Sequence, residues 1–300
     1  MAPISQSWQG VFPALTTTFK SDLALDCSAM EKHFSRQLAS GVHGFVVLGS
    51  LGENGSLGRE EKLEVLRTAV SVSAGRVPVL TGVAESTTAE ACRFATDAQG
   101  NGASGLMVLP PVRYQSDRRE TLEYFRTVAS STDLPIMIYN NPVAYRVDIT
   151  PDMLLDLADE PKFVAVKESS ENIRRVTDIV NLIGDRYRIF AGVDDLALES
   201  LTLGAVGWVA GLVNAFPRET VALYNLACSG NRDALRLYRW FMPLLHLDVS
   251  IKFVQYIKLA EAMTGEGTET VRPPRLQLVG EERDRIMSIV SLALKTRPVV

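Results

Sequence analysis

Short runs of apolar residues alternate with amphipathic stretches along most of the chain. The runs, such as GFVVL at 44–48 and GLMVL at 105–109, contain no alternating polar positions. This continuous pattern is typical of parallel strands that are covered on both faces. The stretches between them repeat apolar residues at helical spacing, as with Met30, Phe34 and Leu38. Residues 11–228 therefore predict eight strand-then-helix units.

Both kinds of element can be placed by residue number. We predict strands over 11–19, 44–48, 77–81, 105–109, 134–139, 163–166, 187–191 and 207–210. We predict helices over 26–40, 59–73, 87–99, 117–130, 150–158, 171–183, 196–203 and 218–228. Asp26 is the expected N-cap of the first helix, because its carboxylate can accept a free N–H of the first turn.

Eight such units without a second sheet favour an α/β fold of the (β/α)8 TIM-barrel type. The alternative is an open doubly wound sheet, but no Gly-x-Gly-x-x-Gly loop follows the first strand. Three amphipathic helices then follow without strands, at 233–247, 250–263 and 281–294, and a Gly/Pro-rich linker is expected at 264–280. We therefore predict a barrel over 1–229 and a C-terminal helical subdomain over 230–300.

Composition narrows the classes of function. The net charge is −4, the sequence pI is about 5.6 and no basic run occurs, so nucleic acid and anionic membranes are not expected partners. No apolar stretch is long enough to span a membrane, and residues 1–10 lack the pattern of a signal peptide. The 3 cysteines and 3 histidines are scattered, so we expect no metal site, no cofactor and a cytoplasmic location.

Lys167 carries the clearest chemical signal. It follows the apolar strand at 163–166 and precedes a polar loop, at the end of a barrel where active sites form. A lysine buried there loses its proton readily and becomes a nucleophile suited to Schiff-base formation. No other lysine has this position; Lys162, for example, lies at the opposite end of the same strand. The alternative interpretation is a solvated lysine that caps the strand.

Two further strand ends carry candidate groups. Tyr139 ends the preceding strand, and its hydroxyl is either a proton shuttle beside Lys167 or a core-capping group bonded to backbone. The glycine-rich loop at 49–55 offers N–H groups and the Ser50 hydroxyl, a combination that can hold a carboxylate. Glu53 in this loop is either a catalytic acid or a structural acid bonded inside the loop, and we favour the second interpretation.

Four motifs together resemble the dihydrodipicolinate synthase and N-acetylneuraminate lyase superfamily. They are GSLGE at 49–53, YNNP at 139–142, KES at 167–169 and GVDD at 192–195, each at the end of an expected strand. The likeness extends from about residue 11 to the last helix. It implies a (β/α)8 barrel with a C-terminal helical domain, usually a homotetramer, that acts on a small 2-oxo acid without a cofactor.

The resemblance also implies roles for individual residues. By analogy, Lys167 forms the Schiff base and Tyr139 moves protons. The loop after the second strand is implied to hold the carboxylate of the 2-oxo acid. The implied substrate-binding residues are Gly49, Ser50, Leu51 and Val209.

Three positions depart from the synthase pattern. Leu51 replaces the second threonine of the loop, so one hydroxyl is lost. Val112 stands where the synthase has a tyrosine supplied across a subunit interface, so we expect the synthase's three-hydroxyl proton relay to be absent. Arg146 is displaced by two positions from the arginine that binds the second substrate. We therefore expect that the chain is not a true dihydrodipicolinate synthase.

One branch of the superfamily looks closer to this chain. The SLGE loop, PPVRY at 110–114 and YNNP are similar to the deaminases of 1-pyrroline-4-hydroxy-2-carboxylate in hydroxyproline catabolism, whose products are 2,5-dioxopentanoate and ammonia. The alternatives are a pyruvate-dependent aldolase or synthase, a 2-keto-3-deoxy sugar acid lyase, and an inactive barrel that serves as sensor or scaffold. Arg113, Tyr145 and Arg146 are loop candidates for substrate contact, although such residues more often lie at a surface or interface.

Overall fold

The computed structural model describes residues 8–300, which contain one eight-stranded parallel sheet. Its neighbours run in the order β1-β8-β7-β6-β5-β4-β3-β2. A bridge between Ala14 and Val46 places the chain after β1 beside β2, so the sheet curls into the predicted barrel. The strands are β1 (Gly10–Pro13), β2 (Phe45–Val47), β3 (Val79–Val83), β4 (Gly105–Val108), β5 (Ile136–Asn140), β6 (Phe163–Glu168), β7 (Arg188–Ala191) and β8 (Gly207–Ala210).

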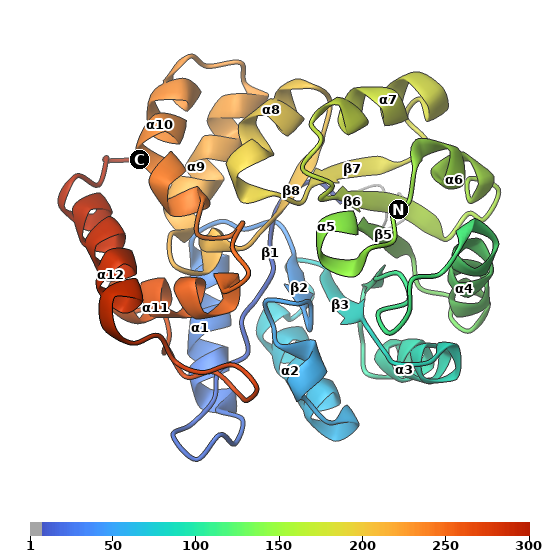
Figure 1. The fold of residues 1–300 in the computed structure, drawn as a ribbon, viewed down its shortest axis with the longest axis horizontal. Helices are drawn as coiled ribbons and strands as arrows, with labels where there is room; N and C mark the ends of the chain where they lie inside the picture. The colour runs from blue at the N-terminus through green and yellow to red at the C-terminus, as the bar shows by residue number, and fades with distance from the viewer. Residues whose placement is uncertain (1–7) are drawn as a thin grey trace.

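Helices surround the barrel on its outer side (Figure 1). The helices that follow strands are α1 (Cys27–Ala39), α2 (Arg59–Ser73), α3 (Thr88–Gly100), α4 (Arg118–Ser130), α5 (Pro142–Tyr145), α6 (Pro151–Asp156), α7 (Arg174–Ile183), α8 (Ala197–Thr202) and α9 (Pro217–Cys228). Short 3-10 turns occur at η2 (Asn54–Ser56), η3 (Asp194–Leu196) and η4 (Leu212–Asn214). The C-terminal helices, orange and red in Figure 1, are α10 (Asp233–Leu245), α11 (Phe253–Thr264) and α12 (Gly280–Lys295).

Side-chain caps fix where helices begin. Asp26 Oδ1 accepts the N–H of Ala29 at 3.0 Å, which confirms the predicted N-cap of α1. Asp117 accepts the N–H of Glu120 at 2.9 Å, and the Glu120 carboxylate accepts the N–H of Asp117 at 3.0 Å. These bonds satisfy N–H groups that lack partners inside the helix, so each cap defines the end of the preceding loop.

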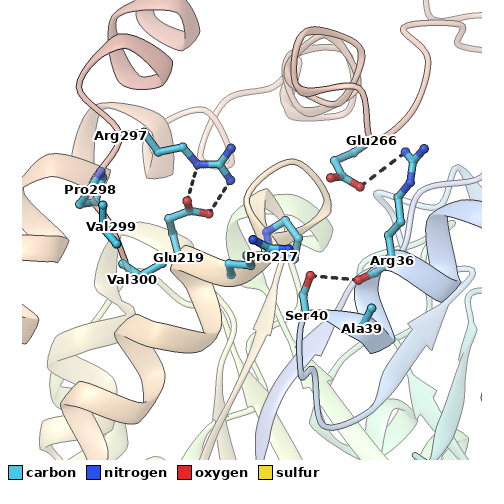
Figure 2. A pocket seen from close by; sticks show the side chains of 11 residues that line it. Arg36, Ala39, Ser40, Pro217, Glu219, Glu266, Arg297, Pro298, Val299 and Val300 are labelled. Carbon is cyan, nitrogen blue, oxygen red and sulfur yellow. Dashed lines mark hydrogen bonds and ion pairs between the residues drawn. The ribbon is translucent and has the colours of Figure 1, made fainter.

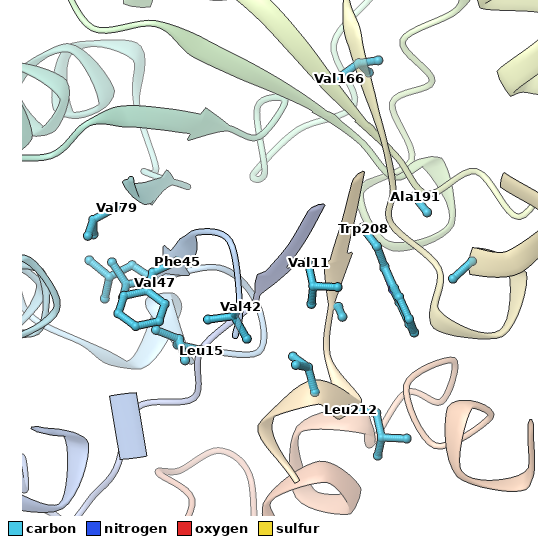
Figure 3. Packing of buried hydrophobic residues seen from close by; sticks show 14 of the residues in the cluster. Val11, Leu15, Val42, Phe45, Val47, Val79, Val166, Ala191, Trp208 and Leu212 are labelled. Carbon is cyan, nitrogen blue, oxygen red and sulfur yellow. The ribbon is translucent and has the colours of Figure 1, made fainter. Parts of the chain in front are cut away.

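Two buried clusters lie on the two sides of the barrel wall. The outer cluster fills the space between strands and helices, with residues such as Val11, Phe45 and Trp208 (Figure 3). The inner cluster fills the barrel itself, and in it the rings of Phe12 and Phe190 pack edge to face with their centres 5.1 Å apart. Each fully buried side chain of this size contributes about 1.5–3 kcal/mol. The filled interior leaves ligand space at the ends of the barrel.

The segment predicted as a linker at 264–280 is anchored to the barrel. Lys258 on α11 donates to Glu53 Oε1 at 2.6 Å, and both side chains are buried. The N–H of Arg272 donates to Glu53 Oε2 at 3.0 Å, and the Arg272 guanidinium pairs with Glu61 on α2. Glu53 therefore makes structural bonds, as favoured, but its partners belong to the C-terminal part of the chain and not to its own loop. The division at residue 229 stays a prediction.

Some boundaries differ from the predicted ones. β1 ends at Pro13 and not at residue 19. The backbone N–H of Thr16 donates to Asn214 Oδ1 at 3.4 Å and not to a neighbouring strand, and the Thr16 hydroxyl donates to Glu261 at 2.8 Å. Gly82 lies inside β3, where a Cβ would overlap the carbonyl oxygen of Leu48. The helix α5 stands in a region expected to be loop.

Residues 1–7 lie outside the described residues, and the expectation of no signal peptide rests largely on them. Within residues 8–300 no helix is both long and apolar enough to cross a membrane.

Candidate active site

Tyr139 and Lys167 are neighbours at the C-terminal ends of β5 and β6. They are register partners, as are Asn140 and Glu168 one position further on. Because side chains alternate along a strand, the first pair lines the cavity at the barrel mouth and the second pair points outward. There Asn140 Nδ2 donates to Glu168 Oε2 at 3.0 Å. The alternation therefore places Tyr139 and Lys167 in the cavity, while the bond between Asn140 and Glu168 joins the two strand ends on the outer side.

The Lys167 amine is buried without a hydrogen-bond partner among residues 8–300. The residue is 7% exposed, and Nζ lies 4.3 Å from the centre of the Tyr139 ring. Burial lowers the pKa of Lys167, and the nearby Asp248 carboxyl opposes this shift. An amine that loses its proton in this position keeps a free lone pair, which is the form that attacks a carbonyl or imine carbon.

Gly192, at the end of β7, makes room for Lys167 and Ser169. A Cβ on Gly192 would overlap Ser169 Oγ and lie 2.8 Å from Lys167 Cγ. Ser169 is 2% exposed, and its hydroxyl has no hydrogen-bond partner in the described part of the chain. A buried hydroxyl without a partner is costly, so a polar group of a bound ligand is its natural complement.

The loop after β2 presents free N–H groups to the same cavity. The N–H groups of Ser50 and Leu51 donate to no acceptor within residues 8–300, while the Leu51 side chain packs in the inner cluster. Leu48 and Glu53, which flank the loop, have left-handed φ angles of 59° and 56°. Such conformations cost on the order of 1–3 kcal/mol each and persist where the surroundings hold them. This backbone arrangement suits a carboxylate ligand.

Tyr145 contributes a hydroxyl that the motifs did not assign. Its hydroxyl is hydrogen-bonded to Ser50 Oγ, and its ring packs edge to face against Tyr139 at 5.9 Å between centres. Tyr139, Ser50 and Tyr145 therefore bring three hydroxyls to the cavity within one chain, but only Ser50 and Tyr145 are bonded to each other among the described residues. The absence of the synthase's own relay stays a prediction. Burial raises the pKa of Tyr139 to about 12 and also raises that of Tyr145, so both phenols hold their protons.

The Tyr139 hydroxyl does not point at Lys167. It accepts a hydrogen bond from Asn141 Nδ2 at 3.1 Å, and the amine faces the Tyr139 ring. The core-capping interpretation expected a backbone partner for this hydroxyl, but the partner is the Asn141 side chain. Tyr139 lines the cavity, and its role as a proton shuttle stays a prediction.

Asp248 is the cavity residue that sequence reasoning missed. It lies between α10 and α11 and lines the cavity together with Lys167. Gly211, at the end of β8, leaves space for the Asp248 carboxyl, because a Cβ at this position would overlap Asp248 Oδ1. The available signal was a single aspartate between the apolar residues Leu247 and Val249, just past the end of a predicted helix.

The cavity at the barrel mouth has a volume of about 440 Å³. All six predicted site residues line it: Gly49, Ser50, Leu51, Tyr139, Lys167 and Val209. Of the loop candidates only Tyr145 does so. Arg113 donates instead to the Ser86 hydroxyl at 3.2 Å, and Arg146 is an exposed residue that ends α5.

A second cavity, of about 430 Å³, lies by the C-terminal residues (Figure 2). Two of its three arginines are engaged with carboxylates: Arg297 pairs with Glu219, and Arg36 lies 3.8 Å from Glu266. The third, Arg218, is exposed. No lysine among the described residues lines this second cavity, so the candidate nucleophile lies at the barrel mouth.

An unpaired amine, a free-N–H loop and buried hydroxyls at the C-terminal face of a (β/α)8 barrel define the class of Schiff-base lyases. The model of the dihydrodipicolinate synthetase family matches residues 7–293, and the chain belongs to this family. It is accordingly an enzyme, a lyase of the Schiff-base lysine type, and the interpretation as an inactive scaffold falls away.

Named relatives agree with this assignment. The chain is 30% identical over 288 residues to a 4-hydroxy-tetrahydrodipicolinate synthase of Methanospirillum hungatei, covering 95% of this chain and 99% of the relative. It is 31% identical to the dihydrodipicolinate synthase of Aquifex aeolicus, whose crystal structure superposes with a TM-score of 0.91 over 95% of this chain and 98% of that one. It is 26% identical to YagE of Escherichia coli K12, solved in complex with pyruvate, with a TM-score of 0.90 over 96% and 99% of the two chains.

Proposed function

We propose that the protein is a Schiff-base deaminase that converts 1-pyrroline-4-hydroxy-2-carboxylate and water to 2,5-dioxopentanoate and ammonia. The observation that carries the proposal is the charge of the cavity. Among the described residues that line it, Lys167 is the only cation, and Glu171 and Asp248 are the carboxyl groups. A substrate with one carboxylate and an otherwise uncharged, hydroxylated body matches this pattern.

A substrate with two carboxylates matches it poorly. Its second carboxylate would find no cation besides Lys167 among the described lining residues, since the candidate arginines, Arg113 and Arg146, lie outside the lining. An unpaired buried charge is expensive, so such a substrate would bind weakly. The cyclic imine carries a single carboxylate and needs no second cation.

The first chemical steps follow from the geometry of the mouth. The free N–H groups of Ser50 and Leu51 bind the carboxylate and direct C2 of the imine toward Lys167. The neutral Lys167 amine attacks C2, and the bond between C2 and the ring nitrogen breaks. The ring opens, the nitrogen stays on C5 as a primary amine, and the substrate is held on Lys167 as an iminium ion.

Elimination and hydrolysis complete the reaction. The Tyr139 hydroxyl oxygen takes a proton from C3 as the hydroxyl passes its own proton to water in the cavity. The enamine that forms expels the 4-hydroxyl, which takes up a proton and leaves as water. Tautomerisation moves the unsaturation to the C5–nitrogen bond. Two hydrolyses then release ammonia from C5 and free Lys167 from C2. One water leaves and two are consumed, so the net reaction takes up one water.

A second candidate is a pyruvate-dependent aldolase or synthase. The relatives favour it, because they include a 4-hydroxy-tetrahydrodipicolinate synthase and a family member solved in complex with pyruvate. Pyruvate also has a single carboxylate, so the same loop and the same Lys167 would serve it. For either function we also propose that the protein assembles as a homotetramer and is located in the cytoplasm. Analytical ultracentrifugation tests the assembly, and cell fractionation tests the location.

One assay separates the two functions. Purified protein is incubated with 1-pyrroline-4-hydroxy-2-carboxylate, and in parallel with pyruvate plus an aldehyde. We expect ammonia and a dicarbonyl acid in the first reaction and no condensation product in the second. Absence of ammonia release overturns the deaminase, and turnover of pyruvate with an aldehyde would establish the alternative.

A further inference from the structure

The Asp248 carboxyl occupies a position built for it. The segment between α10 and α11 carries it into the barrel mouth, where Gly211 leaves the space that a side chain would otherwise fill. A Cβ on Gly211 would lie 2.8 Å from Asp248 Cγ, so the carboxyl packs directly on the backbone at the end of β8. The C-terminal part of the chain, which also lines the cavity with Val249, Ser250, Ile251 and Phe253, thereby supplies a titratable group to the site.

Asp248 differs from its neighbour Asp194 in having no partner. Asp194 accepts bonds from Trp208 Nε1 at 2.9 Å, from the N–H of Leu212 at 2.7 Å and from the N–H of Gly211, so its carboxylate is saturated. Among residues 8–300, the Asp248 carboxyl accepts no hydrogen bond and opens on the cavity. Asp248 is half-buried, and a carboxyl that is partly removed from water and has no donor favours its neutral, protonated form, which can donate a proton to a ligand.

We propose that Asp248 is the general acid that protonates the leaving 4-hydroxyl of the substrate. This inference rests on the proposed deaminase function and names the group that the elimination step requires. The enamine electron pair forms the iminium at C2, the bond between C4 and oxygen breaks, and the Asp248 proton joins that oxygen to give water. The step leaves a carboxylate beside a cationic iminium on Lys167, and solvent returns the proton to Asp248 afterwards.

The charges around Asp248 are consistent with this role. The groups that face it are Lys167 from β6 and Asp194 and Asp195 from η3, and Asp195 is itself held by His246 at 2.8 Å. Burial and the two aspartates raise the pKa of Asp248 well above its ordinary value, and Lys167 opposes the shift. The acid is therefore protonated before the reaction and is stabilised as an anion by the iminium that the reaction creates.

The test compares two half-reactions in the Asp248→Asn variant. The first is release of ammonia from 1-pyrroline-4-hydroxy-2-carboxylate, which needs the leaving hydroxyl. The second is pyruvate bound as a Schiff base, measured by borohydride trapping and by exchange of the C3 hydrogens in heavy water, which has no leaving group. We expect ammonia release to fall by about 100-fold or more, as for loss of a general acid, with trapping and exchange unchanged.

Three results would contradict the proposed role of Asp248. Normal ammonia release by Asp248→Asn overturns the inference. A parallel loss of trapping and exchange also overturns it, since Asp248 would then act through Lys167. A wild-type enzyme that traps pyruvate but releases no ammonia overturns the proposed function, and the role of Asp248 with it. Asp248→Ser, checked by thermal unfolding, repeats the comparison should the first variant fold poorly. Asp233→Asn, on the exposed start of α10, is the matched control and keeps full activity.

Discussion

Three lysines are buried among residues 8–300, namely Lys62, Lys167 and Lys258, and a comparison of the last two shows two different uses of the same residue. Lys167 lies at the barrel mouth and Lys258 on α11 at the seam with the C-terminal helices, with exposed fractions of 7% and 1%. Each amine sits over an aromatic ring, 4.3 Å from the centre of Tyr139 and 4.6 Å from the centre of Phe19. Burial lowers the pKa of both. Neither burial nor an aromatic neighbour therefore distinguishes a functional lysine from a structural one.

The two lysines differ in whether hydrogen-bond acceptors surround their amines. Lys258 donates to Glu53 at 2.6 Å and to the carbonyl oxygen of Thr270 at 2.7 Å, so its charge is matched and its donors are used. Lys167 opens on a cavity and has no acceptor among residues 8–300. An ion pair fixes the first lysine as a cation, and its absence leaves the second free to become a nucleophile.

The largest effect is expected from Lys167→Met. Loss of the nucleophile should reduce ammonia release by about 10⁴-fold or more, because the covalent route disappears. The fold should be retained, since no partner is left behind. The rate of ammonia release and the thermal unfolding curve check this prediction. A variant with substantial turnover would mean that another group does the chemistry.

Lys258→Met should instead damage stability. Its removal leaves the buried Glu53 carboxylate without its main cation, which costs about 3–5 kcal/mol of unfolding free energy. Urea denaturation measures the loss. The double variant Glu53→Gln/Lys258→Met should recover much of it, because no buried charge remains. If Lys258→Met unfolds like the wild type, the pair is not the anchor that the geometry indicates.

Tyr145→Phe should have a smaller effect, confined to the chemical step. It removes the hydroxyl bonded to Ser50 but keeps the ring that packs on Tyr139. We expect kcat to fall by roughly 10–100-fold, at the lower end of proton-transfer contributions, with little change in KM. Steady-state kinetics decide it. A change in KM alone would assign Tyr145 to binding and not to proton movement.

The smallest expected effects are the changes of kcat/KM and of stability with pH that arise from Lys167. The attacking amine must be neutral, so kcat/KM should rise with pH and level off below the ordinary lysine pKa of 10.5. The folded protein also holds this proton less tightly than the unfolded chain does. The resulting cost to stability is present below the lowered pKa and fades as pH rises toward 10.5. Lys167→Met should therefore be more stable than wild type at neutral pH and lose that advantage in alkali. Equal stability across this range would contradict a depressed pKa.

The sequence predicted the barrel because its signal is local and repeated. Continuous apolar strands followed by amphipathic helices gave nearly all elements, and strand ends gave Lys167, Tyr139 and the Ser50 loop. The threonines after β1 were misassigned, because β-branched residues favour strands and only the fold shows Thr16 bonded to Glu261.

Contacts between distant segments could not be read in this way. Asp248 reaches the site from a turn beyond the barrel, and Tyr145 reaches Ser50 across 95 positions. The bond between Glu53 and Lys258 spans 205 positions, and neither residue alone signals the other. Pattern and spacing describe an element's own neighbours, and these three features depend on how elements are packed together.

The most direct measurement is borohydride trapping followed by peptide mass spectrometry. Wild-type protein is treated with pyruvate or with 1-pyrroline-4-hydroxy-2-carboxylate, reduced and digested, beside Lys167→Met and a Lys258→Met sample confirmed to be folded. We expect an adduct on Lys167 alone, present in wild type and Lys258→Met and absent from Lys167→Met. An adduct on Lys258 or another lysine, or none in the wild type, would contradict it.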